Sequence, residues 1–563
     1  MKRIIECVPN YSEGRDHAVI DRIVAAIKEV EGVTLLDVDP GEATNRTVVT
    51  FVGEPEPVCE AAFRGARMAQ ELIDMRKHHG AHPRSGATDV LPLIPVAGIT
   101  LEECAELARS LAKRLWEELG IPCYCYEAAA FTPERKNLAV CRAGEYEALP
   151  EKLSDPARKP DFGGDYNDTV AKAGATNVGA RDFLVAVNFN LNTTSTRRAM
   201  AVAFDVREKG RKAREGGSLT GKLLKDENGN QIWIPGTLKG CKAIGWYIDE
   251  YGIAQVSMNI TDINTTPLHI AYEEVCRAAN ARGLKVTGTE IVGLVPKKVL
   301  IQAGRFYLEK QQRSLGISEE EIVKIAVKSM SLDDLKPFNP KEKVIEYLME
   351  KPKDGLAQMS VEGFVRETAS ESAAPGGGSI SACMGAFGAA LASMVANLSA
   401  HKRGWDDRWK EFSDVAEEGQ KLLNELLDLI DEDTAAFNRI MDVFSMPKGT
   451  PEEKEARAKA MEEATFHAAE VPFRTMETAL KALPLALAMA QKGNPASASD
   501  AGVAALAAVA GIKGARLNVR INCAGLQDKT AAAPMLRKAD EIVAEAALLE
   551  AEVLKAVENH IEL

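Results

Sequence analysis

The feature of this sequence that most restricts its fold is a change in hydrophobic periodicity near residue 340. Before it, runs rich in β-branched residues alternate with segments whose apolar residues recur at helical spacing; after it, helical spacing alone remains. Helices that alternate with strands imply sheets covered by helices, and a long series of amphipathic helices implies a bundle. The chain is therefore predicted to be multidomain, with an α/β part followed by an all-α part.

The α/β part divides into two similar series of elements. Strands are expected at 3–12, 33–40 and 46–53 with helices at 16–30 and 56–75, and then strands at 181–192, 253–262 and 285–296 with helices at 194–210 and 267–283. We expect two lobes of α+β sandwich type, with a cleft between them. The predicted boundaries are 1–180 and 181–330 for the lobes, 331–358 for a linker and 359–563 for the all-helical domain.

Composition excludes several classes of function. A formal net charge of -13 argues against wholesale binding of nucleic acid, although an anionic small ligand remains compatible with it. Ten cysteines spread from Cys7 to Cys523 predict a reduced, cytoplasmic protein without disulfides or a zinc site. No secretory signal is expected at the start. Residues 379–399 match a membrane span in length, but their Gly, Ala and Ser content predicts a buried central helix instead.

Three of the eight histidines, His78, His79 and His82, fall within five positions. A metal site, a solvated loop and a proton-transfer centre are the alternatives. Gly80 and Pro83 oppose a continuous helix through the cluster, and no carboxylate follows at the spacing of a helical zinc motif. Histidine titrates near neutral pH and can carry a proton between two nitrogens, so acid–base chemistry is the sharper hypothesis.

Further motifs surround this cluster. Arg84 offers a planar fork for a carboxylate. The ordered motifs are ECVPNYSEGRD (6–16), DVDPGEATNRTVVTFVG (37–53), GAHPRSGATDVLPLIPV (80–96), KPDFGG (159–164) and AIGWYIDEYGIAQVSMN (243–259). Together they resemble glutamate formimidoyltransferase from residue 1 to about residue 330. That family transfers a formimidoyl group from N-formimidoyl-L-glutamate to tetrahydrofolate, giving 5-formimidoyltetrahydrofolate and glutamate.

The resemblance implies roles for individual residues. His82, in the H-P-R motif, is the implied catalytic histidine, which takes the proton from folate N5 and returns one to the departing glutamate nitrogen. Asp39 is expected to orient or charge His82, a strand-end turn being the alternative, and Arg84 is a supporting residue. His78 and His79 are expected to be ordinary loop residues. Folate binding is implied, against a plain interlobe linker, for Gly163, Gly164, Asp165, Tyr166 and Lys172. The loop at 217–240 has no assigned role.

The helical part carries two features that suit a ligand. AAPGGGS, at 373–379, opens a helix of small residues; its free backbone N–H groups suit an anion, although a glycine turn into a tightly packed helix explains it equally well. Asp431, Glu432 and Asp433 lie in an apolar helical pattern. Such a run is either a solvated acidic face or the source of a carboxyl group with a raised pKa.

With MPKGTPEEK (446–454), VP (471–472) and ASDAGVAALAA (498–508), these features resemble formimidoyltetrahydrofolate cyclodeaminase from about residue 340 onward. The whole chain is thus similar to the bifunctional formimidoyltransferase-cyclodeaminase family. The resemblance makes Asp433 the catalytic acid–base group, with Asp431 as a supporting neighbour. It places folate on Gly376, Gly377, Gly378 and Ser379. Possible polar lining, with helix caps and core amides as alternatives, comes from Asp500, Arg516, Asn518 and Asn522.

The expected protein is a cytoplasmic enzyme of histidine degradation and one-carbon metabolism that releases 5,10-methenyltetrahydrofolate, glutamate and ammonia. Polyglutamylated tetrahydrofolate is its expected cosubstrate, with no metal. A homo-oligomer, tetramer to octamer, is expected, with no nucleic-acid or membrane partner. Three alternatives remain: formyl transfer by the N-terminal half, a folate-binding scaffold without turnover, and a metal-dependent hydrolase built on the histidines.

Overall fold

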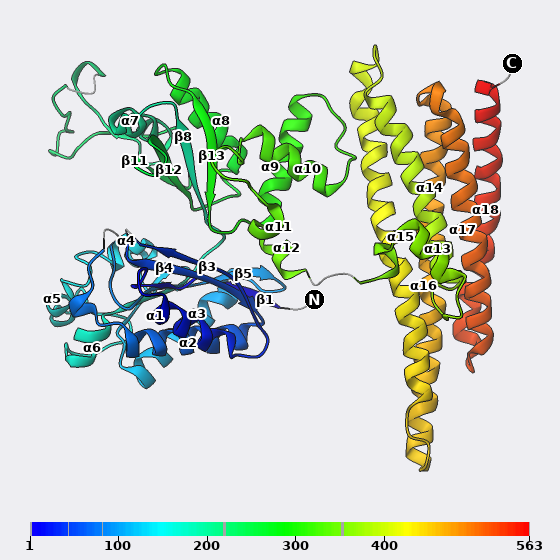
Figure 1. Cartoon of the computed structure of the whole chain (residues 1–563), viewed down its shortest axis with the longest axis horizontal. Coiled ribbons are helices and arrows are strands. Elements are labelled where there is room, and N and C mark those ends of the chain that lie inside the picture. Colours follow the sequence, from blue (N-terminus) through cyan, green and yellow to red (C-terminus); the bar gives the residue numbers. More distant parts are fainter. Residues whose placement is uncertain (1–2, 43, 81–82, 218–220, 351–353, 562–563) are drawn as a thin grey trace. The chain divides into compact units, whose positions relative to one another are not determined.

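The computed structural model describes residues 3–42, 44–80, 83–217, 221–350 and 354–561. The chain forms two compact units. Met1–Val299 with Met330–Glu350 make the first unit, and Leu300–Ser329 with Lys351–Leu563 make the second. Sheets lie in the first unit and long helices in the second (Figure 1). The predicted succession of an α/β part and a helical part is therefore confirmed at this level.

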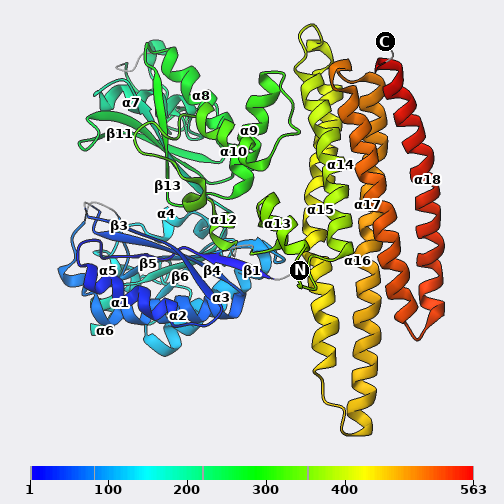
Figure 2. The same ribbon diagram turned by 45° about the vertical axis from the view of Figure 1, so that its right-hand side comes forward.

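A mixed sheet of seven strands organises the N-terminal lobe of the first unit. Its strands are β1 (Ile4–Cys7), β2 (Asn10–Tyr11), β3 (Val33–Gly41), β4 (Arg46–Gly53), β5 (Thr88–Ala97), β6 (Cys123–Glu127) and β7 (Thr176–Ala180). Strands β1, β2 and β3 each pair antiparallel with β4, and β1 and β2 also pair antiparallel with β5. Strand β7 pairs in parallel with both β5 and β6. Helices α1 (His17–Lys28), α2 (Pro55–Leu72) and α3 (Leu101–Leu119) pack on one face of this sheet (Figure 2).

Alternation along the strands separates this covered face from an open one. Ile5 and Cys7 on β1, like Val49 and Phe51 on β4, join the core beneath the helices. Because successive side chains of a strand point to opposite faces, Glu6 lies on the open face. The open face of the sheet thus carries polar groups.

A second, antiparallel sheet has the strand order β11-β12-β8-β13. These strands are β8 (Val185–Leu191), β11 (Cys241–Ile248), β12 (Ile253–Ile260) and β13 (Val286–Val292). Helices α7 (Thr196–Val206) and α8 (Leu268–Asn280) pack on one face. On the other face, Gln255 donates a hydrogen bond to the side chain of Asn190 (2.8 Å) and Asn188 donates one to Glu290 (3.0 Å).

Short elements complete the first unit. They are α4 (Leu138–Cys141), α5 (Leu149–Ser154), α6 (Asp168–Ala173), the hairpin of β9 (Arg211–Lys212) with β10 (Trp233–Ile234), α11 (Pro340–Lys343) and α12 (Ile345–Met349). The last two bring the chain back to the first unit, where Val344 bridges to Val295.

The second unit is a helical bundle. Its helices are α9 (Lys297–Lys310, from Leu300), α10 (Glu319–Ser329), α13 (Val361–Thr368), α14 (Gly377–Ala400), α15 (Trp409–Phe444), α16 (Pro451–Lys492), α17 (Ala498–Gly525) and α18 (Lys529–Ile561). Helix α14 packs against α15, α16 and α17, and its many small residues form one continuous core with them. By length and composition alone, Gly377–Ala400 and Pro495–Gly525 are apolar enough to cross a membrane, but most of each window is buried in the bundle.

Close packing of α14 against α17 depends on Gly388. A Cβ atom at this position would lie 2.8 Å from the carbonyl oxygen of Ala504 and 2.9 Å from the Cβ of Ala508. We expect Gly388→Val to lower the unfolding free energy of the helical unit by roughly 1–3 kcal/mol, since overpacked cores shift backbone. Thermal denaturation followed by circular dichroism measures this. Met384→Leu, at an exposed position of α14, is the control, and equal melting temperatures for both variants would contradict the prediction.

Candidate functional site

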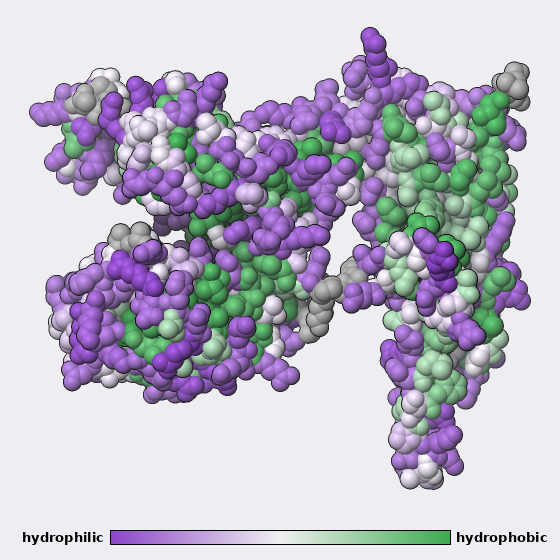
Figure 3. Space-filling view, in the orientation of Figure 1, coloured by the Kyte–Doolittle hydropathy of each residue, from purple (hydrophilic) through white to green (hydrophobic). Residues whose placement is uncertain are grey.

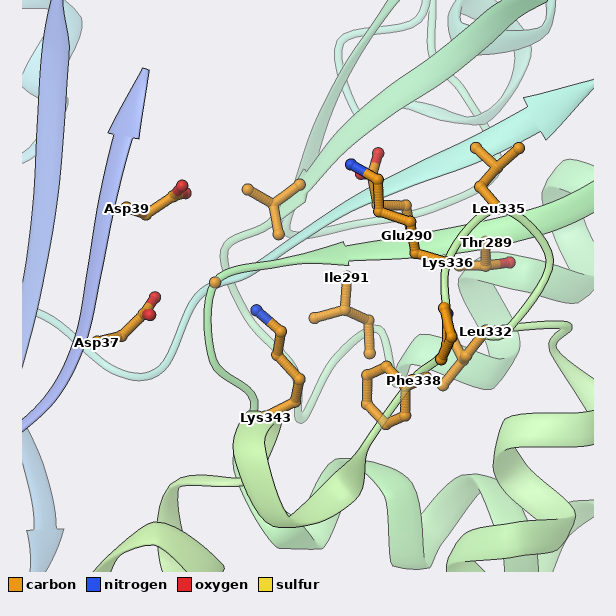
Figure 4. Close-up of a pocket in the computed structure, with 13 residues that line it drawn as sticks. Asp37, Asp39, Thr289, Glu290, Ile291, Leu332, Leu335, Lys336, Phe338 and Lys343 are labelled. Carbon is orange, nitrogen blue, oxygen red and sulfur yellow. The ribbon is translucent and has the colours of Figure 1, made fainter. Parts of the chain in front are cut away.

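A cleft lies between the open faces of the two sheets of the first unit. Two adjoining cavities, of about 320 and 300 Å3, share Asp37, Asp39, Val292 and Gly293 in their lining. In Figure 4, Asp37 and Asp39 project from β3 toward Lys343 and the residues of β13. The cleft therefore has carboxylates on one wall and a mixture of charges on the other.

Asp37 of β3 is close enough to Asp39 to act on its pKa. Burial raises the pKa of Asp39, the neighbouring Asp37 raises it further, and Lys343 opposes both effects. Asp39 lies opposite Val48 of β4, and Arg46 follows two residues away on the same face. Diagonal neighbours of this kind lie about 7–8 Å apart, so an anionic and a cationic side chain adjoin at this end of the cleft.

Two arginines at that end share one carboxylate. Asp89, which is fully buried, accepts hydrogen bonds from Arg46 and, at 2.8 Å, from Arg142, and its other oxygen accepts from the backbone of Ser85. Two guanidinium groups on one carboxylate leave a positive charge. The Nε of Arg142 is buried without an acceptor in the part of the chain that the structure describes. Arg46 and Arg142 line the cleft, so this pair suits an anionic group of a ligand.

His82, the predicted catalytic histidine, falls outside the described residues. Its neighbour His78 is buried: Nε2 donates to the carbonyl of Asn45 (2.9 Å) and Nδ1 accepts from Arg84 (3.3 Å). Burial lowers the pKa of His78 and favours the neutral ring. The fork of Arg84 binds Glu147 at 2.8 and 2.7 Å. The carboxylate partner of Arg84 is therefore within the chain, and Arg84, the last residue of the H-P-R motif, is held by Glu147 and His78.

The predicted folate-binding residues of the first unit lie apart from the lining of the cleft. Asp165 is exposed, and Lys172 on α6 donates to the carbonyl of Glu71 (2.8 Å). Tyr166 shares a hydrogen bond with Tyr146, whose ring lies 6.0 Å from the guanidinium of Arg84. Gly163 and Gly164 precede these residues in the same loop, and a Cβ at Gly164 would meet the ring of Trp116. The loop therefore adjoins the segment that carries the H-P-R motif.

In the second unit, Asp433 of α15 meets the N-terminus of α14. The hydroxyl of Ser379 donates to Asp433 at 2.9 Å, and the backbone N–H of Ser379 also hydrogen-bonds this carboxylate. A Cβ at Gly378 would lie 2.0 Å from Oδ1 of Asp433, so a larger residue there would displace this carboxylate. Burial nevertheless raises the pKa of Asp433 overall. The sequence-predicted residues Gly378, Ser379 and Asp433 are thus brought together, with Gly376 as the N-cap of α14.

Other polar residues predicted for this site differ in their positions. Asn518 of α17 lies against Gly377: a Cβ atom at Gly377 would be 3.2 Å from the side-chain amide nitrogen of Asn518. Asp431 accepts instead from the backbone of Leu356 (2.6 Å) and holds the segment before α13.

The remaining predicted lining residues have structural partners or positions. Arg516 pairs with Asp540, and Asn522 donates to the carbonyl of Ala468. Asp500 lies in the first turn of α17. Asn522 thus makes the contact of the core-amide alternative, whereas Arg516 forms an ion pair with an exposed aspartate.

Sequence reasoning missed several residues of the cleft. Glu6, Arg46 and Arg142 line it, and although Glu6 and Arg46 lie in two of the quoted motifs, no role was predicted for any of the three. Two features of the sequence could have indicated them: the acid Glu6 inside the apolar strand IIEC, and the arginine at the start of the strand RTVVTFVG. Among the described residues, no group of three or more His, Cys, Asp or Glu side chains could hold a metal ion.

The raised pKa of Asp433 has a consequence for stability. Folding favours the protonated form of Asp433. The stability that this carboxyl group contributes is therefore fully present below its pKa in the unfolded chain, and it is lost as the pH rises through its pKa in the folded protein. We expect Asp433→Asn to raise the melting temperature of the helical unit at neutral pH, and the gain to shrink toward pH 4. Thermal denaturation across pH measures this, with Asp442→Asn, exposed on the same helix, as control. A lower melting temperature at pH 7 would contradict it.

Comparison with known proteins matches three family models in order along the chain. They are "Formiminotransferase domain, N-terminal subdomain" at residues 4–181, "Formiminotransferase domain" at 186–350 and "Formiminotransferase-cyclodeaminase" at 360–541. A formimidoyltransferase-cyclodeaminase of Sus scrofa is 43% identical over 561 residues, 99% of either chain. A glutamate formimidoyltransferase of Streptococcus pyogenes is 42% identical over 55% of this chain and 94% of its own length. A methenyltetrahydrofolate cyclohydrolase of Methylorubrum extorquens is 37% identical over 36% of this chain and 97% of its own length. The chain therefore belongs to the formimidoyltransferase-cyclodeaminase family.

Proposed function

We propose that this chain is a bifunctional folate enzyme. Its first unit transfers the formimidoyl group of N-formimidoyl-L-glutamate to tetrahydrofolate, and its second unit cyclises the 5-formimidoyltetrahydrofolate to 5,10-methenyltetrahydrofolate with release of ammonia. The observation that carries this proposal is the match of transferase and cyclodeaminase family models, in order, together with a relative of the same name along 99% of the chain.

The charges of the cleft fit the formimidoyl donor. In this donor a cationic amidine is attached to the carbon that carries the α-carboxylate, so opposite charges adjoin. The cleft offers the same arrangement in reverse: Arg46 and Arg142 for a carboxylate, and Asp39 for the amidinium. His82 then takes the N5 proton as N5 bonds to the formimidoyl carbon, and a proton goes to the glutamate nitrogen as its bond to that carbon breaks.

The contacts of Asp433 support a role in cyclisation. Folate N10 forms a bond to the formimidoyl carbon, and the bond from that carbon to the terminal nitrogen breaks. N10 loses its proton in this step, and the terminal nitrogen of the amidinium gains one and leaves as ammonia. A carboxyl group whose pKa is raised by burial holds a proton closer to neutral pH than an exposed one does. Ser379 fixes the orientation of this carboxyl through its hydroxyl and backbone N–H.

The proposal includes a cytoplasmic homo-oligomer, tetramer to octamer, that uses polyglutamylated tetrahydrofolate and no metal. Apolar side chains exposed on the helical unit support self-association (Figure 3). Those on α14 and α17 are Met384, Phe387, Met394, Leu398, Val503, Leu506, Leu517 and Ile521. Thinly spread free cysteines support a reducing compartment.

Partial reactions test the two assignments. With N-formimidoyl-L-glutamate and tetrahydrofolate, His82→Ala should lower the rate of methenyltetrahydrofolate formation at least about 100-fold, because proton transfer is lost. With supplied 5-formimidoyltetrahydrofolate it should react like wild type. Asp433→Asn should transfer normally and accumulate the formimidoyl intermediate.

The measurement is the absorbance of methenyltetrahydrofolate, with release of glutamate followed separately. His79→Ala and Asp442→Asn, both exposed, are the matched controls. Normal cyclisation by Asp433→Asn, or normal transfer by His82→Ala, would refute the corresponding role. Turnover by wild type would at the same time exclude a scaffold without catalysis, and full activity in strong chelator would exclude the metal-dependent hydrolase.

Donor choice separates formimidoyl from formyl transfer. We expect kcat/KM for N-formimidoyl-L-glutamate to exceed that for N-formyl-L-glutamate by about 10-fold or more, because only the amidinium makes a charge-assisted contact. Competition between the two donors in one assay, with product masses measured, gives this ratio. A preference for the formyl donor would favour the formyltransferase alternative instead.

A further inference from the structure

Glu6 is the most anomalous side chain of the cleft. It is only 4% exposed, yet it lines the cleft from the middle of β1. Within the described residues its carboxylate has no hydrogen bond or ion pair, and Arg181, in the same cavity, acts on it only through its charge. Burial raises its pKa to about 7, and Arg181 only partly offsets this. A buried carboxyl group without partners is costly, so its presence requires an explanation.

Besides Arg181, the lining around Glu6 contains apolar and aromatic side chains. In the same cavity of about 300 Å3, Val8 and Pro92 flank it on the first sheet, and Phe183 and Leu294 line the opposite side. Tyr126 adds a ring that packs beneath the backbone of Gly179. Walls of this kind suit a flat, weakly polar ring, with Glu6 as a polar group that fixes its orientation.

From this geometry, and resting on the function proposed above, we propose that the carboxylate of Glu6 binds the 2-amino-4-oxopyrimidine edge of the pterin ring of tetrahydrofolate. That edge presents two parallel donors, N3–H and the 2-amino group. Two parallel N–H donors match the two oxygens of one carboxylate, and such bidentate contacts are both strong and specific. The contact would satisfy Glu6, which the described chain itself does not do.

The amidinium of the donor, which is the cationic ligand of the cleft, fits less well at Glu6. It must lie beside its own α-carboxylate, and the arginine pair for that carboxylate lies near Asn10, which accepts from Arg46. Glu6 and Asn10 are four residues apart on an extended segment, roughly 13 Å. With the pyrimidine edge on Glu6, the opposite side of the pterin, which bears N5, points toward the donor end of the cleft.

Glu6→Gln tests this placement, because glutamine keeps the shape but loses the paired acceptors. We expect its KM for tetrahydrofolate in the transferase reaction to rise about 10- to 100-fold, as for loss of a charge-assisted contact. Its KM for N-formimidoyl-L-glutamate should stay within about twofold. The chain supplies an internal control, since cyclisation of supplied 5-formimidoyltetrahydrofolate by the second unit should not change. Glu31→Gln, exposed in the same lobe, is the matched variant.

A folate analogue localises the contact on the ligand. Replacing the 2-amino group of tetrahydrofolate by methyl should raise the KM of wild type and have little further effect on Glu6→Gln. Equal penalties from the analogue in both proteins, or an unchanged KM for tetrahydrofolate in Glu6→Gln, would overturn the proposal. A parallel rise of both KM values with a lower melting temperature would indicate a structural role and would also overturn it.

The proposed function and this inference fail in different ways. If wild type transfers no formimidoyl group, the proposed function is wrong. Binding of 5-formyltetrahydrofolate, measured by equilibrium dialysis, then tests the inference alone. Loss of one folate site per chain in Glu6→Gln would support the inference, and unchanged stoichiometry and affinity would refute it.

Discussion

Helices cover only one face of each sheet in the first unit, and this constraint determines where its chemistry can occur. Apolar side chains at alternate strand positions are buried beneath α1, α2 and α3 in the first sheet, and beneath α7 and α8 in the second. The intervening positions form the open faces that line the cleft, and these carry Glu6 and Arg46. Asp89 then stabilises the arrangement, because without this buried carboxylate Arg46 and Arg142 would repel each other.

The second unit reaches a similar result by different means. Small residues allow α14 to approach its neighbours closely, and the absence of a side chain at Gly378 lets the carboxylate of Asp433 reach the first turn of α14. In both units a carboxyl group is thus held partly or fully out of water, Glu6 by a sheet and Asp433 by a helix N-terminus. Burial opposes its charge, and a ligand or a proton then completes the site.

Sequence patterns predicted some of this well. Periodicity gave the order of strands and helices and the central position of α14, since alternation and helical spacing are local properties. Ordered motifs led to Gly378, Ser379 and Asp433 together, and the structure places them in contact. The roles of neighbouring acids were harder to predict from the sequence. Asp431 is two positions from Asp433 on the same helix, so its side chain points in another direction and accepts hydrogen bonds from backbone N–H groups near Leu356. The roles of His82 and Asp433 remain predictions for the assays above.

By itself, then, the sequence determined the two kinds of architecture, the family resemblance and the segments in which catalytic groups are predicted, because these depend on residues close together along the chain. Only the tertiary structure decided which distant side chains meet. Arg46, Asp89 and Arg142 come from three separate segments, and Glu6 appears in sequence as one acid in an apolar strand. Pairing, burial and unsatisfied charge arise from contacts across the fold, and local pattern does not encode them.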